Sequence, residues 1–99
     1  MIAVQVQDEN GVVESKHPDP HIVDALREHA PADSKCLQFI DPYGDTTFNP
    51  YQARALVAEM EVAARSLVGP GQRERAVALV DFVRPVGEMI HMYLKFVGE

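Results

Sequence analysis

One long helix is marked at both of its ends in the sequence, and this feature constrains the fold most. Asn49 is a favourable N-cap, Pro50 suits the first helical position, and Gln52 can reach back to close a capping box. A Gly-Pro pair at 69–70 predicts that the helix ends at about Val68. Its apolar residues recur at helical spacing and form one stripe: Leu56, Val57, Met60, Ala63, Ala64 and Leu67. A helix with a single apolar stripe buries that stripe against a second layer.

Alternation of apolar and polar residues at the two ends of the chain predicts two strands that each bury one face. In residues 2–7, one face consists of Ile2, Val4 and Val6. Residues 89–97 repeat the pattern, with one face made of Met92, Leu94 and Phe96 and the other made of His91, Tyr93 and Lys95.

An Asn-Gly pair after the first strand predicts a hairpin, because both residues accept the positive φ angles of a tight turn. With this pair as the loop, Val6 lies opposite Ser15, and Asp8 lies opposite Val13. The return strand, about 12–16, is weak, since only Val13 would join the apolar face.

Three further elements are expected between the terminal strands. Asp19 and Pro20 predict the cap and the first position of a helix that stops near His29. The segment Lys35–Asp41 is apolar on nearly both faces, which predicts a central strand. Residues 72–84 form a second long helical pattern, which Pro85 ends or kinks. This pattern places four residues in the core: Ala76, Leu79, Val80 and Val83.

The predicted order is strand, weak strand, helix, strand, helix, helix, strand. This order favours an α+β fold, a two-layer sandwich in which a three- to four-stranded, largely antiparallel sheet carries about three helices on one face. A chain of 99 residues is too short for two independent cores, so we expect a single domain over residues 1–99.

The charge balance and the cysteine count narrow the classes of partner and compartment. Acidic residues outnumber basic ones 15 to 9, which gives a formal net charge of −6. Phosphate binding needs clustered Lys and Arg, so we expect no nucleic-acid partner. No stretch approaches the roughly 20 apolar residues of a membrane span. A single cysteine, Cys36, and an N-terminus without a leader pattern predict a cytoplasmic protein with no disulfide framework and no thiolate zinc site.

The densest polar cluster follows the predicted central strand. Asp41, Tyr43 and Asp45 lie in a turn, where the two carboxylates could hold a cation, divide acid and base roles, or accept N–H groups of the turn itself. His91 and Tyr93 lie on the less apolar face of the last strand. If that strand neighbours the central one, Asp41, Tyr43, His91 and Tyr93 line one patch: a ligand cleft, a partner surface or a hydrogen-bonded sheet face. No established catalytic signature is present, and we expect no cofactor.

A resemblance to other proteins rests on two segments: residues 36–46 (CLQFIDPYGDT) with Phe48 and Asn49, and residues 91–96 (HMYLKF). In them the chain resembles small uncharacterised bacterial proteins, among them proteins of mobile gene cassettes and immunity-like proteins that neutralise a toxin. The resemblance covers about the last two-thirds of the chain. It implies an accessory bacterial protein and transfers no catalytic residue.

The leading hypothesis is therefore a non-enzymatic accessory protein that acts by protein–protein interaction, as immunity and adaptor proteins do. The acidic balance suits a basic partner and would speed its capture by electrostatic steering. The candidate acids for that surface are Asp41, Asp45, Glu59, Glu61, Asp81 and Glu88. A second hypothesis is a small-molecule-binding domain or minor enzyme built on the patch around Asp41, Tyr43, His91 and Tyr93. A third is a homodimeric module that associates through an exposed sheet edge or face.

Overall fold

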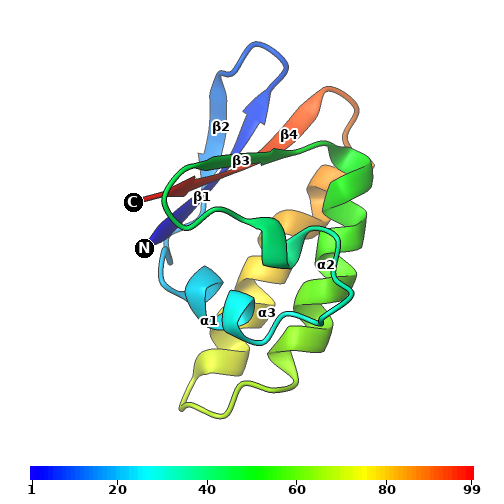
Figure 1. Ribbon diagram of the computed structural model, residues 1–99. Helices are drawn as coiled ribbons and strands as arrows, with labels where there is room; N and C mark the ends of the chain where they lie inside the picture. Colours follow the sequence, from blue (N-terminus) through cyan, green and yellow to red (C-terminus); the bar gives the residue numbers. More distant parts are fainter.

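Strands and helices form two layers in the computed structural model, which describes residues 1–99 (Figure 1). The strands are β1 (Ile2–Asp8), β2 (Val13–Lys16), β3 (Asp45–Phe48) and β4 (Met92–Gly98). The helices are α1 (Ile22–Glu28), α2 (Pro50–Ala64) and α3 (Gln72–Val83), with two short 3-10 helices, η1 (Leu37–Phe39) and η2 (Arg84–Glu88). The three α-helices lie on one side of the sheet, which confirms the predicted α+β sandwich.

The four strands are antiparallel and follow the order β2-β1-β4-β3. The two ends of the chain pair in the middle of the sheet, where Ile2 lies opposite Gly98 and Val4 lies opposite Phe96. β2 and β3 are the edge strands. The central pair therefore joins the first and last residues of the chain, and the sheet is complete only when both are in place.

The central strands turn their apolar face onto the helices, as the alternation predicts. Val4 of β1 and Phe96 of β4 are almost fully buried, and Phe96 packs edge-to-face on Phe48 with 5.8 Å between the ring centroids. The predicted stripe of α2 enters the same core, in which Ala64 is only partly buried. The predicted core residues of α3 are all buried: Ala76, Leu79, Val80 and Val83.

The capping box of α2 forms as predicted, but the helix ends earlier than expected. The side chain of Asn49 accepts the N–H of Gln52, and the side chain of Gln52 accepts the N–H of Asn49, both at 2.9 Å. The helix ends at Ala64 instead of about Val68. Beyond its end, the side chain of Arg73 donates to two backbone carbonyl groups of the next turn. These bonds satisfy carbonyl groups that a longer helix would have used.

The prediction of a central strand over Lys35–Asp41 is wrong, because this segment forms η1 and its flanking loops. The Glu59 carboxylate of α2 accepts the backbone N–H groups of residues 35, 36 and 37 at 2.7, 3.0 and 2.8 Å. Those groups cannot also serve a strand ladder. The place beside β4 is taken by β3. The residues that the segment buries recur at helical spacing: Cys36, Leu37 and Ile40.

The β1–β2 hairpin follows the predicted register only in part. Val6 lies opposite Ser15 as predicted, but Val13 lies opposite Gln7 instead of Asp8, because a bulge shifts the register. The Asp8 side chain accepts two backbone N–H groups of the turn, both at 2.9 Å, so the turn is wider than a two-residue loop. Val13 is consequently exposed and does not join the apolar face.

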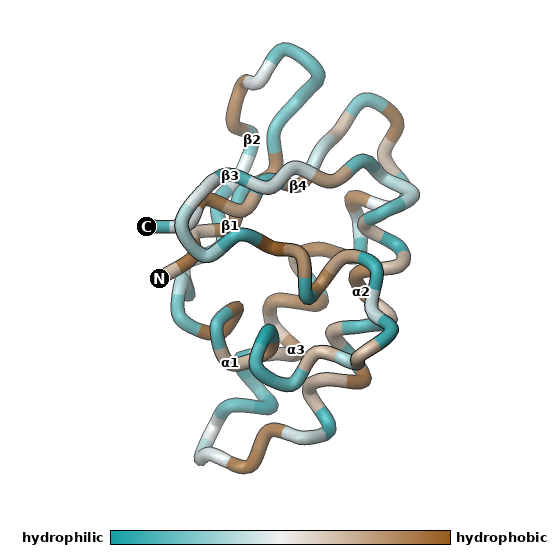
Figure 2. The backbone as a smooth tube through the Cα atoms, viewed as in Figure 1, coloured by the Kyte–Doolittle hydropathy of each residue, from teal (hydrophilic) through white to brown (hydrophobic).

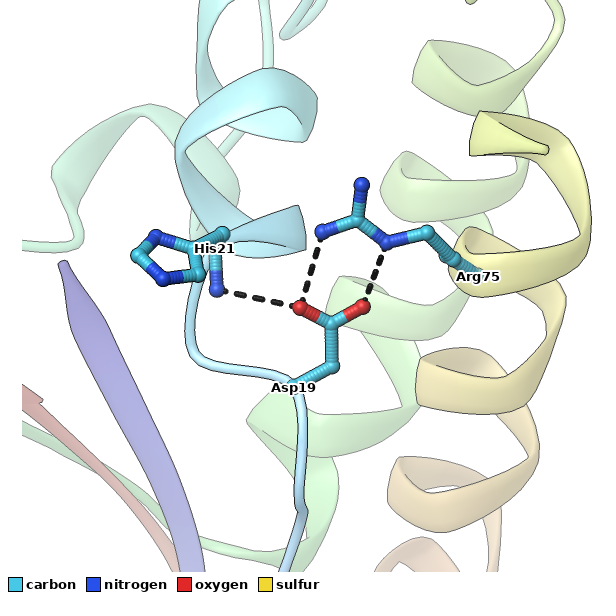
Figure 3. A network of polar contacts seen from close by, with 3 residues as sticks. All are labelled: Asp19, His21 and Arg75. Carbon is cyan, nitrogen blue, oxygen red and sulfur yellow. Dashed lines mark hydrogen bonds and ion pairs between the residues drawn. The ribbon is translucent and has the colours of Figure 1, made fainter. Parts of the chain in front are cut away.

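The first helix begins later than predicted. Its N-cap is His21, and Asp19 accepts the backbone N–H of His21 at 3.2 Å instead of capping the helix. The Asp19 carboxylate is engaged by Arg75 of α3, with Nε–Oδ2 at 2.6 Å and Nη2–Oδ1 at 2.9 Å (Figure 3). The hydrogen bond from Arg75 is the main cause that lowers the pKa of Asp19 to about 2. The helix ends at Glu28 with His29 as its C-cap, as predicted.

Candidate functional site

The structure places the predicted site residues at two opposite ends of β4. Asp45 lies opposite Val97, near the end of the chain, and Asp41 and Tyr43 lie in the loop before β3. His91 and Tyr93 lie at the start of β4, beside the first turn of α2 (Figure 1). The patch expected from the sequence is therefore not assembled, because the segment that ends at Asp41 is not a strand beside β4.

The carboxylates of the 41–45 turn are used within the turn and its neighbouring strand. Asp41 accepts the N–H of Tyr43 at 2.8 Å, and its own N–H donates to the hydroxyl of Thr46 at 2.9 Å. Asp45 forms an ion pair with Lys95 of β4 at 3.3 Å. Tyr43 is 85% exposed and has no side-chain partner. These contacts stabilise the turn and its attachment to β4.

His91 and Tyr93 line a cleft of about 390 Å³ between the start of α2 and the connection that leads from η2 to β4. Arg54 also lines this cleft: its Nε donates to the carbonyl of Gly87 at 2.8 Å, and its guanidinium lies 5.5 Å from the ring centroid of Tyr51. The lining of the cleft thus includes a positive group.

A second cleft, of about 380 Å³, lies on the other side of the same connection, against β2. Its lining is mostly apolar and comes from β1, β2, α3, η2, the connection after η2 and β4: Val6, Glu14, Ser15, Phe82, Pro85, Val86, Met89 and Met92. Met89 lines both clefts. We call the second one the methionine cleft.

The connection between the clefts was predicted as the first part of the last strand, which instead begins at Met92. His91 has a φ of 70°, a left-handed conformation that is uncommon for a residue with a side chain. Its Nδ1 lies 2.9 Å from Oε2 of Glu9 in the β1–β2 turn. This contact links the connection to the hairpin turn, next to the point where the pairing of β1 with β4 begins at Asp8 and Met92.

Together these parts form one end of the molecule, which we call the tip surface: residues 8–14, residues 87–91 and Tyr51. Ile90 is 81% exposed and Tyr51 is 76% exposed, and Val12, Val13 and Met89 are also exposed apolar residues there. In Figure 2 both loops at the top carry a brown stretch beside a teal one. The tip surface contains four carboxylates: Asp8, Glu9, Glu14 and Glu88. The tip surface therefore combines exposed apolar side chains with negative charge.

The six acids proposed from the sequence do not share one surface. Glu59 is used to bind the backbone of residues 35–37, Glu61 forms an ion pair with Arg84 at 3.1 Å, and Asp45 pairs with Lys95. Asp41 holds its own turn, and Asp81 lies on α3 beside the groove between α2 and α3. Glu88 belongs to the tip surface. Sequence analysis missed Glu9 and Glu14, although both flank the hairpin turn that it predicted.

Cys36 is buried, and burial together with the nearby Glu59 charge raises the pKa of its thiol, which favours the unreactive protonated form. No group of three or more His, Cys, Asp or Glu side chains is placed to hold a metal ion. None of the helices has the length and apolar character needed to cross a bilayer.

Comparison of the chain with protein-family models, with curated proteins and with solved structures finds no match. A proposal about function therefore rests on the chemistry of the surface.

Proposed function

We propose that the chain is a non-enzymatic interaction module that binds a basic protein through the tip surface. The observation that carries the proposal is the exposure of Ile90 and Tyr51 at one end of the fold, where the carboxylates of Glu14 and Glu88 make no hydrogen bond or ion pair within the chain. Soluble proteins rarely leave clustered apolar side chains in water without a partner.

The two kinds of side chain have different tasks in such an interface. Burying a large apolar side chain contributes about 1.5–3 kcal/mol, so Ile90 and Tyr51 would supply much of the affinity. The carboxylates would supply steering, because a net charge of −6 attracts a basic protein over several ångströms and raises its association rate.

A homodimer through the same surface is less favourable than a complex with a basic protein. A second copy would bring the same carboxylates against those of the first, and like charges at an interface oppose association. The charge of the tip surface therefore selects a partner of opposite sign.

The test is a pull-down from a lysate of the source cell with three immobilised proteins: wild type, Ile90→Lys and Val68→Lys. Val68 is 92% exposed in the connection between α2 and α3, so Val68→Lys makes the same change of charge away from the tip surface. We expect a stoichiometric basic protein on wild type and on Val68→Lys, and its loss on Ile90→Lys.

Ionic strength provides a second readout, because exposed charges are screened in moderate salt. The captured amount should fall between low and moderate salt. The proposal would be overturned if all three baits retained the same proteins. It would also be overturned if the captured amount of the partner did not change with salt concentration.

A further inference from the structure

The methionine cleft borders the tip surface, with which it shares Met89 and Glu14, and its lining is mostly apolar. Its lining includes Phe82, Met89 and Met92, and Glu14 of β2 is the one charged residue in it. Met side chains adapt their shape to an incoming group, and exposed methionines are frequent at binding surfaces that accept varied apolar side chains.

We infer that the methionine cleft takes an apolar anchor from an extended basic segment of the partner. This inference rests on the proposed function and names the chemistry of the partner at that site. The anchor is an aliphatic or aromatic side chain, and Lys or Arg residues of the same segment face the carboxylate of Glu14.

The extended form follows from the strand that borders the cleft. β2 is an edge strand whose four residues are all exposed. The N–H of His17 donates to the carbonyl of Val4 at 2.9 Å, so by strand alternation the N–H and carbonyl of Lys16 point away from β1. A partner segment can pair with these free groups, as in other complexes that extend a sheet.

The spacing of the segment follows from the same geometry. Side chains of a strand alternate between two faces, so residues two apart point to the same side. Glu14 lines the cleft that the anchor enters. A basic residue that meets Glu14 therefore lies two positions from the anchor.

The other concavities suit such a segment less well. Arg54 lies in the cleft beside His91 and would repel a basic side chain. The groove between α2 and α3 has two arginines on its rim, and its Glu61 is already paired with Arg84. The methionine cleft has no basic side chain in its lining.

The probe is the peptide Thr-Lys-Thr-Leu-Thr-Lys-Thr, blocked at both ends and titrated into the full ¹⁵N-labelled chain. Two matched peptides carry Ser in place of Leu or Glu in place of both Lys. We expect saturable shifts at the amides of residues 13–16 and of Phe82, Met89 and Met92. Affinity should fall about tenfold or more for the Ser peptide, and binding of the Glu peptide should be lost.

Two variants of the chain test the lining without touching the core. Glu14→Gln should weaken the peptide about two- to fivefold at low salt, whereas Glu28→Gln, an exposed acid on α1, should not change it. Met89→Gln, at a half-exposed position, should weaken the peptide about tenfold, with an unchanged circular dichroism spectrum.

The outcomes separate this inference from the proposed function. If a basic partner binds wild type and is lost on Ile90→Lys, but the peptide shifts other residues or fails to compete with that partner, the inference is overturned and the proposed function stands. If no basic partner is captured and the peptide does not bind, both are overturned. Shifts at the cleft together with competition support the inference.

Discussion

Residues 35–41 and residues 89–91 were both predicted to be strand, and the fold uses them in opposite ways. Both contain apolar residues, and neither belongs to a strand of the sheet. In the first, Leu37 is fully buried and Glu59 binds the backbone. In the second, Ile90 is 81% exposed, and the neighbouring Glu88 carboxylate makes no hydrogen bond or ion pair within the chain. The difference teaches that an acid or an apolar residue indicates a binding surface only where the chain itself has left it without a partner.

The largest expected effect compares the two apolar side chains directly. Leu37→Ala removes a fully buried side chain and should lower the free energy of unfolding by about 2–5 kcal/mol. Ile90→Ala should change it by less than about 0.5 kcal/mol, because an exposed side chain loses no packing. Urea unfolding of both variants measures this. A destabilisation of Ile90→Ala comparable to that of Leu37→Ala would show that the connection is part of the core.

The next effect compares two glutamates. Glu59→Ala leaves three backbone N–H groups without their acceptor and should cost about 2–3 kcal/mol, since hydrogen bonds to a charged group are the strong class. Glu14→Ala should be nearly neutral for stability, because no contact within the chain depends on its carboxylate. The free energy of unfolding in urea checks both. Equal losses in the two variants would contradict the distinction between internal and available carboxylates.

The elements that could be predicted from the sequence are those whose signals are local. The capping box at Asn49 and Gln52 and the alternation of β1 depend on neighbours within a few residues, and both are confirmed. The segment 35–41 could not be predicted in this way, because its conformation depends on Glu59, which lies more than 20 residues later in the chain. The Glu59 carboxylate of α2 therefore overrides the local pattern that favours a strand.

The candidate site was predicted incompletely for the same reason. His91 and Tyr93 were identified, but the assumed neighbour, the strand ending at Asp41, does not form, so Asp41 and Tyr43 lie at the far end of the sheet. The clefts at the tip surface depend on the pairing of the first and last strands. A signal that pointed to the correct end was the hairpin turn, where two glutamates flank Val12 and Val13.

Acid titration distinguishes an internally bound carboxylate from one at the tip surface. The pKa of Asp19 is about 2 in the fold and 3.8 ordinarily, so its contribution to stability is present above pH 4 and is lost as the pH falls from about 4 to about 2. Asp19→Asn should be less stable than wild type at pH 7, and the difference should vanish near pH 2. Urea midpoints across this range measure it. Glu88→Gln, at a carboxylate that makes no hydrogen bond or ion pair within the chain, is the matched control and should be as stable as wild type at pH 7. A loss of stability in this variant as large as that of Asp19→Asn would contradict the comparison.

The smallest effect concerns the tie between the two loops of the tip surface. Glu9→Gln weakens the 2.9 Å contact with His91, so residues 88–91 should exchange their amide hydrogens several-fold faster while the free energy of unfolding changes by less than about 0.5 kcal/mol. Both side chains are more than half exposed, which is why global stability should hardly change. The matched control is Glu28→Gln, which should leave this exchange unchanged. Wild-type exchange rates at residues 88–91 in Glu9→Gln would show that the hairpin does not position the connection. The connection would then be held by its own backbone, where the N–H of Met89 donates to the carbonyl of Val86 at 3.1 Å.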